Sequence, residues 1–435
     1  MFNSKTAISL RVLSILMLPL LACAMIQSVF LTPTSHPAET ATSTPAFPVK
    51  VLRQTSVFLT KVARQTSASP TRTLASITPI LAQSSPGTPT PSPTAPPAAP
   101  FVHSVTISAP ALANNLLGES LERDLVIYLP VSYFQFQKRY PVIYYLLDFG
   151  EQGAPAVLNP QTLQKDINVG IAREMIIVVV SGANSLGGSF YVNSPVTGNW
   201  DDFVTQDVVS YVDAHYRTLP QPASRGIAGH AMGGSGALAL AMRHPDVFGA
   251  VYSLSPYLFD DNALAESLMF SPPSMIDNFV DLQARESLLP ADDAVSDMQN
   301  NAGDEQFALA YGAAFVPNPQ AKPPYVDYPY YRQGGQLSRD ETIWKRWEAG
   351  FGAIPDKIQA YKENQSKLNG IAIDCGANDQ YRWLPRGCEY FSAQLTAAGI
   401  PNQLNRFAGD HQSNLEQRIR EFMLPFFSDT LVFDT

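Results

Sequence analysis

The sequence is poor in cysteine, histidine and charge, with three cysteines, six histidines and 15% charged residues in a chain of 435. The cysteines form no Cys-x-x-Cys pair and no cluster with histidine, so we expect neither a disulfide-built scaffold nor a metal site. No nucleotide motif stands out, and we expect no cofactor. The apolar stretch Val12–Ala22 is shorter than the roughly 20 residues that a membrane-spanning helix needs.

Residues 1–23 have the pattern of an export signal. Lys5 and Arg11 flank a short basic region, and Val12–Ala22 has the length of a signal peptide's apolar core. Its end, Leu-Leu-Ala-Cys, resembles a bacterial lipobox, in which the cysteine is lipidated after cleavage. An ordinary secretory signal and an uncleaved anchor are the alternatives. We expect an exported protein, extracellular or at the cell surface, with Cys23 as a candidate lipid attachment.

Export also bears on the two remaining cysteines. An oxidising compartment favours a disulfide between Cys375 and Cys388, and the loop between them is short enough. Two buried free thiols are the alternative.

Residues 24–100 are rich in proline, threonine and serine, most clearly in Pro86–Pro97. Such sequence cannot bury enough apolar surface to fold, so we predict an extended tether. Residues 1–100 hold seven basic residues and one acidic residue, which leaves 22 basic and 37 acidic residues, a net charge of −15, for the rest. A folded part this acidic argues against a nucleic-acid partner. The basic tether suits a place beside a membrane, and a solvated linker is the alternative.

Strands and helices alternate over residues 101–430, which predicts an α/β domain with a mostly parallel sheet and helices on both faces. Continuous apolar runs indicate strands buried on both faces, and helical spacing of apolar residues indicates the helices. The predicted strands are Val102–Ile107, Asp124–Leu129, Tyr140–Leu147, Met175–Val180, one ending in Ile227–His230, Phe248–Leu254, Leu368–Asp374 and Gln403–Phe407. The predicted helices are Leu158–Ile171, Asn199–Tyr216 with Asn199 as its cap, Ala237–Met242, Tyr390–Ala398 and Leu415–Phe427.

Residues 260–368 interrupt this alternation. The segment holds a Pro/Tyr-rich stretch at Pro323–Tyr331 and two tryptophans, Trp344 and Trp347. We interpret it as an insertion over the carboxyl edge of the sheet, where α/β folds keep their ligands, so it would be a lid or a pocket wall. A helical hairpin that merely covers the core is the alternative.

The stretch Ser224–Pro256 organises the folded part. It has the pattern strand, sharp turn, helix, loop and strand, with Gly233 and Gly234 in the turn and a helix that ends before Pro245. This is the layout of a nucleophile elbow, in which Gly-x-Ser-x-Gly lifts a serine oxygen above a sheet. Here the motif is Gly229-His230-Ala231-Met232-Gly233, so the nucleophile position carries a methyl group.

The run from Gly229 to Pro256 resembles the esterase family of α/β-hydrolases, which includes feruloyl and acetylxylan esterases, S-formylglutathione hydrolase, enterochelin esterases and mycolyltransferase-type acyl transferases. Arg123–Pro130 and Arg139–Leu147 resemble the first strands of that family. The resemblance covers about residues 101–427 apart from the insertion. It implies an α/β-hydrolase fold and a triad in the chain order serine, aspartate, histidine.

This resemblance places the triad. The nucleophile position falls on Ala231, the acid on Asp379 in the loop after the strand that ends at Asp374, and the base on His411 after the last strand. Asp374 itself and Asp410 are rivals for the acid. The other histidines fit the base less well, since they lie in the tether, before the sheet, on helices or in the elbow.

The oxyanion hole of such a site needs two backbone N–H donors. The resemblance assigns one to Met232 and the other to the loop after the strand Tyr140–Leu147, at Phe149 or Gly150. In the family this loop usually has the sequence Leu-His-Gly, whereas here Asp148 follows the leucine. Backbone donors survive a change of side chain, but Asp148 would place a negative charge near the developing oxyanion.

Loss of the nucleophile lowers the rate of such a triad by about six orders of magnitude, which excludes acyl-enzyme chemistry at Ala231. We therefore expect a surface pseudoenzyme that binds an acyl ester, a carbohydrate-linked ligand or a protein partner. One alternative is an active carboxylesterase or acyltransferase that uses Ser235, a water activated by His411 and Asp379, or an unrecognised nucleophile. Ala231 as an engineered replacement and a surface scaffold without a ligand are the others.

Overall fold

The computed structural model describes residues 101–301 and 303–434. The predicted signal peptide, the lipidation candidate Cys23 and the tether lie outside the described residues. Within the described part, none of the helices combines the length and the apolar character needed to cross a bilayer.

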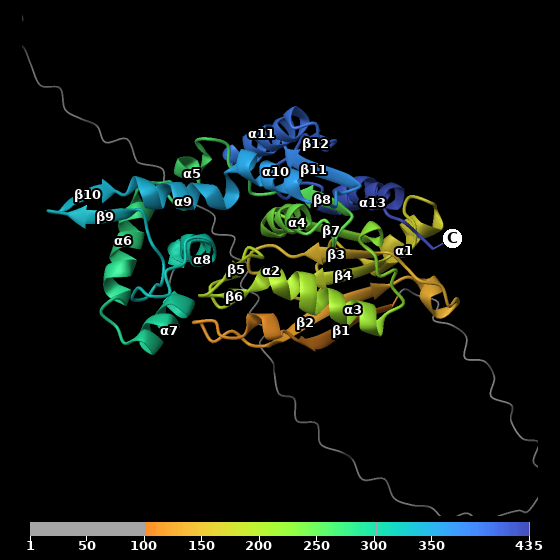
Figure 1. The fold of residues 1–435 in the computed structure, drawn as a ribbon, viewed down its shortest axis with the longest axis horizontal. Helices are drawn as coiled ribbons and strands as arrows, with labels where there is room; N and C mark the ends of the chain where they lie inside the picture. Colours follow the sequence, from red (N-terminus) through yellow and green to blue (C-terminus); the bar gives the residue numbers. More distant parts are fainter. Residues whose placement is uncertain (1–100, 302, 435) are drawn as a thin grey trace, which may run out of the picture. The chain divides into compact units, whose positions relative to one another are not determined.

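The described residues form an eight-stranded sheet (Figure 1). Strands β3, β4, β7, β8, β11 and β12 run parallel, while β1 and β2 add an antiparallel edge. In sheet order the strands are β1 (Phe101–Ser108), β2 (Glu122–Leu129), β4 (Ile176–Val180), β3 (Val142–Leu146), β7 (Arg225–His230), β8 (Ala250–Leu254), β11 (Gly370–Gly376) and β12 (Gln403–Phe407). The prediction of a mostly parallel α/β sheet is confirmed.

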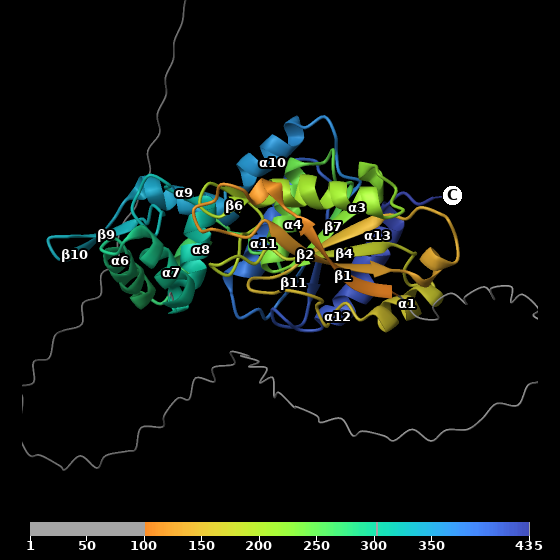
Figure 2. The same cartoon turned by 90° about the horizontal axis from the view of Figure 1, so that it is seen from below.

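Side chains of the central strand β3 alternate between two apolar cores. Tyr144 and Leu146 belong to one core, and Ile143 and Tyr145 to the other. Figure 2 shows α3 and α4 on one side of the sheet and α1 and α12 on the other. The helices around the sheet are α1 (Pro160–Asn168), α3 (Val209–His215), α4 (Met232–Arg243), α11 (Trp383–Ala397), α12 (Leu415–Arg418) and α13 (Leu424–Thr430). Coverage of both faces explains why β3 is an uninterrupted apolar run.

Two helices begin earlier than predicted. Helix α4 starts directly at Met232, since Gly233 and Gly234 continue the helix instead of forming a separate turn. Helix α11 starts at Trp383, and Pro385 lies in its first turn, where proline is tolerated.

The predicted helix over 199–216 is present as α2 (Trp200–Asp202), a π-helical segment and α3, but its predicted cap is wrong. The side chain of Asn199 makes no capping hydrogen bond within the described part of the chain. Instead, Asn193 of the short strand β5 (Asn193–Ser194) accepts hydrogen bonds through Oδ1 from the N–H groups of Asp201 and Asp202, at 2.9 and 3.2 Å. The cap comes from a strand that pairs with β6 (Gly198–Asn199), a contact that helix signals in the sequence do not reveal.

A matched pair of variants tests the assignment of Asn193 as the helix cap. We expect Asn193→Ala to lower the free energy of unfolding by about 1 kcal/mol, the usual effect of losing an N-cap side chain. Asn199→Ala, at an equally exposed position, should change it by less than about 0.5 kcal/mol. Urea denaturation measures both, and equal effects of the two substitutions would contradict the assignment.

Residues 274–351 of the insertion form a helical layer at one end of the domain (Figures 1 and 2), whereas its first and last helices pack against α11. The elements of the insertion are α5 (Ala263–Glu266), α6 (Ser274–Glu286), α7 (Ala291–Asn301), α8 (Gln306–Phe315), β9 (Tyr330–Gln333), β10 (Gln336–Arg339), α9 (Glu341–Phe351) and α10 (Ile354–Glu363). Aromatic rings hold it together: Phe279 stacks on Tyr328 at 4.0 Å, and Trp347 lies 5.4 Å from both Tyr328 and Tyr311. Helix α8 also contacts Phe149 and Tyr257, which follow the carboxyl ends of β3 and β8.

The structure has Cys375 of β11 and Cys388 of α11 as free thiols rather than as the disulfide that export favoured. Both are fully buried, and burial raises the pKa of the Cys388 thiol well above its usual value. The structure therefore has two buried free thiols, the alternative to a disulfide between these cysteines.

Candidate functional site

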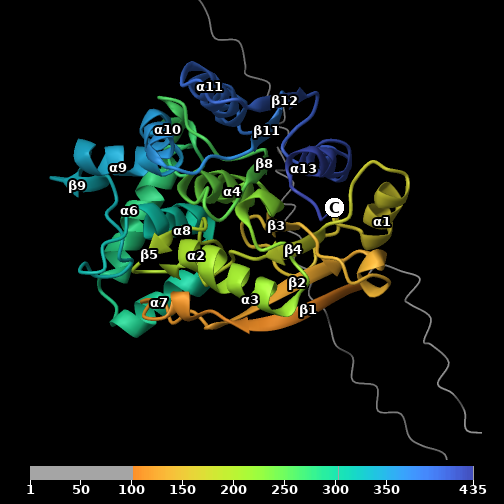
Figure 3. The ribbon, with the colours of Figure 1, turned by 45° about the vertical axis from the view of Figure 1, so that its right-hand side comes forward.

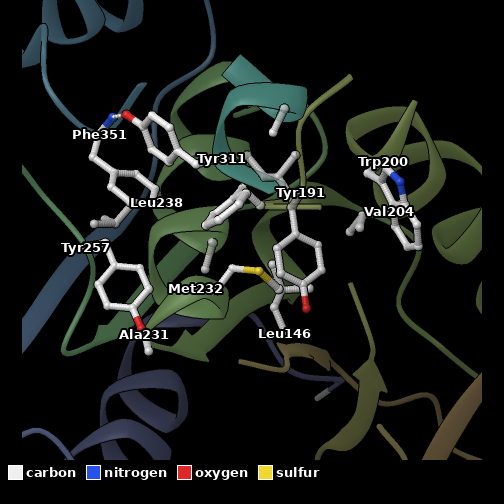
Figure 4. Packing of buried hydrophobic residues seen from close by; sticks show 14 of the residues in the cluster. Leu146, Tyr191, Trp200, Val204, Ala231, Met232, Leu238, Tyr257, Tyr311 and Phe351 are labelled. Atoms are coloured by element: carbon white, nitrogen blue, oxygen red, sulfur yellow. Dashed lines mark hydrogen bonds between the residues drawn. The ribbon is translucent and has the colours of Figure 1, made fainter. Parts of the chain in front are cut away.

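Ala231 occupies the apex of a sharp turn between β7 and α4. Its φ of 50° and ψ of −112° lie outside the regions that non-glycine residues usually adopt, as in a nucleophile elbow. Glycines make the turn possible, because a Cβ on Gly233 would lie 2.0 Å from the carbonyl oxygen of Leu146 and one on Gly229 would lie 2.4 Å from Gly233 C. Figure 4 shows Ala231 beside Met232 and Tyr257 in the packed core.

The predicted acid and base are in contact. His411 Nδ1 lies 2.8 Å from Asp379 Oδ2, and both side chains are buried. The rival carboxylates are engaged elsewhere, since Asp374 pairs with Arg418 and Asp410 accepts hydrogen bonds from Ser413. The two residues that the resemblance assigned as acid and base therefore lie in hydrogen-bonding contact.

The other ring nitrogen of His411 is buried, and no group of residues 101–301 or 303–434 hydrogen-bonds to it. In a serine hydrolase this Nε2 faces the nucleophile hydroxyl. Residue 231 is alanine, whose methyl group offers no hydrogen-bonding atom to this nitrogen.

The side chain of Asp148 accepts hydrogen bonds from the backbone N–H groups that were expected to bind an oxyanion. Its Oδ1 accepts hydrogen bonds from the N–H of Met232 at 3.0 Å and from that of Phe149 at 2.7 Å. The third candidate donor, Gly150, gives its N–H to the carbonyl of Gly187 at 2.9 Å. A carboxylate oxygen therefore lies where two backbone donors would stabilise a tetrahedral intermediate.

Burial raises the pKa of Asp148 to about 6, although the two backbone N–H groups oppose that shift. The side chain is 16% exposed, so the carboxylate is largely removed from water. Its second oxygen, Oδ2, lies 3.8 Å from Nδ1 of His230.

His230 contributes more than the packing that its place in the elbow predicts. Its Nε2 lies 3.1 Å from the carbonyl oxygen of His411, and the two rings are 4.7 Å apart. Burial lowers the pKa of His230 well below its usual value, so the ring is neutral at pH 7. Asp148 was recognisable from the sequence because it departs from the Leu-His-Gly pattern, but nothing in the sequence indicated a role for His230 beyond its position beside Ala231.

Aromatic rings pack around the side chain of His411. Tyr257 lies parallel to the His411 ring at 5.8 Å, and Tyr381 meets it edge-on at 5.4 Å. Phe307 of helix α8 contacts Tyr257 and Phe149 at 5.8 and 5.1 Å. Phe307 of the insertion therefore packs against two of the aromatic residues around the site, and Figure 3 shows α8 on the side of the domain where α6 and α9 lie.

A cavity of about 490 Å³ lies between α4 and the insertion, and Tyr257 forms part of its wall. Its lining is mainly apolar, from Leu238, Met242, Phe315 and Phe391 among others. Tyr257 therefore separates this cavity from the ring of His411. The space suits an apolar acyl or aryl group.

Ser235, the alternative nucleophile, also lines this cavity, but its hydroxyl is already engaged. Its Oγ accepts a hydrogen bond from the N–H of Tyr257 at 2.7 Å and donates toward the carbonyl oxygens of Ala231 and Tyr257 at 3.0 and 3.1 Å. These bonds tie the helix to the following loop and disfavour a nucleophilic role.

Comparison with known proteins gives one family. A sequence model described as “Putative esterase” matches residues 119–414. The MPT51/MPB51 antigens of Mycobacterium bovis and Mycobacterium tuberculosis are 34% identical to this chain over 124 residues, which cover 28% of this chain. The chain thus spans 40% of the length of these curated relatives.

Solved structures with similar folds include a ferulic acid esterase, 21% identical, which covers 77% of this chain and 99% of its own with a TM-score of 0.47. An S-formylglutathione hydrolase from Agrobacterium tumefaciens is 14% identical and covers 77% of this chain and 96% of its own, also with a TM-score of 0.47.

Proposed function

This chain belongs to the esterase family of α/β-hydrolases, and from that premise we propose that it is an exported member that has lost ordinary serine hydrolysis and binds an acyl ester or a carbohydrate-linked ligand. The observation that carries the proposal is the combination of Ala231 at the elbow with Asp148 on the oxyanion donors. Two independent positions depart from the catalytic pattern, and each opposes the same reaction.

The first departure removes the attacking atom. Alanine has no oxygen, so no acyl-enzyme forms at position 231, although Asp379 still orients His411. The second departure acts on the transition state. A carboxylate bound to the N–H groups of Met232 and Phe149 leaves a developing oxyanion without those donors and beside a negative charge.

The retained cavity supports a binding role. An apolar acyl or aryl group would lie between α4 and the insertion, with its carbonyl end toward Tyr257 and the site. Aromatic residues of the cavity lining, among them Tyr257, Phe315 and Phe351, would then form the wall that the ligand contacts. The N-terminal sequence 1–23 supports export, and Cys23 supports attachment to a membrane.

One experiment tests both halves of the proposal. The protein is incubated with p-nitrophenyl hexanoate in EDTA, and the melting temperature and the release of nitrophenol are followed together. We expect the melting temperature to rise, because a ligand that binds the folded state stabilises it. We expect nitrophenol release no faster than with His411→Ala, and no labelling by a fluorophosphonate probe.

Release that depends on His411, or a probe adduct located by mass spectrometry on Ser235 or another residue, would show an active hydrolase instead. An unchanged melting temperature across acetyl, hexanoyl and feruloyl esters would favour a scaffold without such a ligand.

A further inference from the structure

We infer that His230, His411 and Asp148 form a binding site for one divalent transition-metal ion, with Zn²⁺ as the ion that the ligands fit best. The inference goes beyond the proposed loss of serine chemistry and does not depend on it. It assigns a new ligand to the polar groups that the missing serine leaves behind.

The three side chains converge from three separate segments. Asp148 follows β3, His230 ends β7 and His411 follows β12. One ligand atom of each lies within 4.8 Å of the other two, and the pair His230 Nδ1 and Asp148 Oδ2 is 3.8 Å apart. Tetrahedral Zn²⁺ with bonds of about 2.0–2.1 Å holds its ligand atoms about 3.4 Å apart, so modest side-chain shifts would complete the site.

Hydrogen bonds orient both rings for metal binding. Nδ1 of His411 contacts Asp379 at 2.8 Å, and Nε2 of His230 contacts the carbonyl oxygen of His411 at 3.1 Å. Each ring thereby donates the N–H of one nitrogen to an oxygen and keeps a lone pair on the other. Partners of this kind, a carboxylate and a backbone carbonyl, are those that hold metal-binding histidines in one tautomer.

Asp148 is oriented in the same way. The N–H groups of Met232 and Phe149 hold its Oδ1, which leaves Oδ2 directed at Nδ1 of His230. The carboxylate is thus fixed by backbone donors and presents one free oxygen. Two imidazole nitrogens and one carboxylate oxygen are a donor set that suits zinc better than magnesium or calcium, which prefer oxygen ligands alone.

The unpartnered ring nitrogen of His411 is a second observation that points to a ligand at this cluster. The residue is 2% exposed, and its Nε2 has no hydrogen-bond partner among the described residues. A buried polar atom without a partner destabilises a fold, so native proteins rarely retain one. A metal ion bound to Nε2 would satisfy it, and the methyl group of Ala231 does not compete for that nitrogen as a serine hydroxyl would.

The same geometry explains why the sequence predicted no metal site. Metal motifs are recognised when ligands lie a few residues apart, whereas these three meet only after the sheet has formed. A fourth ligand from the protein is absent from the cluster within the described residues, so the site would keep an open position, as catalytic zinc sites do.

The test is zinc binding by the full, untagged chain. Equilibrium dialysis against Zn²⁺ followed by metal analysis should find one ion per chain with a Kd in the micromolar range or tighter. Co²⁺ in place of Zn²⁺ should give the visible absorption of a low-symmetry site with nitrogen and oxygen ligands. Asp148→Asn and His230→Gln should each weaken Zn²⁺ binding at least tenfold, and His215→Ala, an exposed histidine on α3, should leave it unchanged.

Asp148→Asn retains an oxygen for the two backbone donors, so its melting temperature without metal serves as the folding control. No bound Zn²⁺ in the wild type would overturn the inference, as would equal affinity in wild type, Asp148→Asn and His230→Gln. Sulfur-to-cobalt charge-transfer bands would place the ion on cysteine and would also overturn it. Binding is measured without an ester, and the ester assay is run in EDTA, so failure of one proposal is distinguishable from failure of the other.

Discussion

Ala231→Ser combined with Asp148→Ala is expected to turn this protein into an esterase, with at least about 100-fold more activity than Ala231→Ser alone. Serine at the apex of the elbow restores the attacking oxygen, whose loss costs a triad about six orders of magnitude. The single variant still has Asp148 Oδ1 on the N–H groups of Met232 and Phe149. Removing one oxyanion donor typically costs 10²–10³ in rate, and here both are occupied.

Hydrolysis of p-nitrophenyl acetate in EDTA measures this effect. Ala231→Ser with Asp148→Asn is the matched control, since its amide oxygen can still accept both hydrogen bonds but carries no charge. If the hydrogen bonds to the backbone donors are the obstacle, hydrolysis by this control stays slow. If the negative charge is the obstacle, its rate of hydrolysis approaches that of the Ala231→Ser, Asp148→Ala double variant.

Adding His411→Ala to the active double variant should abolish the gain, because the serine then lacks its base. Equal activity in Ala231→Ser with and without Asp148→Ala would contradict the role given to Asp148.

Arg418→Ala is expected to destabilise the fold by about 3–5 kcal/mol, the usual result of leaving one partner of a buried ion pair alone. The Arg418 side chain is 3% exposed and pairs with the buried carboxylate of Asp374 through Nη2 and Nε. It also donates to Ser255 Oγ at 2.8 Å and lies over the ring of Phe407. Alanine would leave the Asp374 carboxylate buried without its cation.

An exposed ion pair supplies the control. Arg406 and Glu389 lie 2.7 Å apart with side chains 50% and 44% exposed. Arg406→Ala should cost less than about 1 kcal/mol, since water screens such pairs. Urea denaturation compares the two variants, and similar losses would show that burial of the Arg418 pair contributes little.

The centre of the sheet was predictable because strands such as β3 and β4 are continuous apolar runs, and the predicted Met175–Val180 differs from β4 by one residue. The edge strand Gln403–Phe407 was predicted with both ends correct although it is not an apolar run. Asp379 and His411 were placed by the resemblance to the family, and their positions after parallel strands agree with it. Residues that follow parallel strands gather at one edge of the sheet, so knowing the strands brings two distant loops together.

The remaining features depend on side-chain directions that no sequence pattern records. Asp148 was recognisable as an unusual charge, but its hydrogen bonds to two backbone donors follow from the exact path of the loop after β3. His230 shows the same limit, because the sequence places it next to Ala231 without saying which ring nitrogen faces Asp148. Asn193 replaced Asn199 as a cap because the chain between them doubles back.

The glycines of the elbow fix the backbone of residue 231 independently of its side chain. Backbone packing of Gly229 and Gly233 against neighbouring atoms, including those of Leu146, holds the turn in shape. The conformation of residue 231 is therefore set by its neighbours and not by the side chain that it carries. A serine placed at this position would meet a backbone that already has the shape of the elbow.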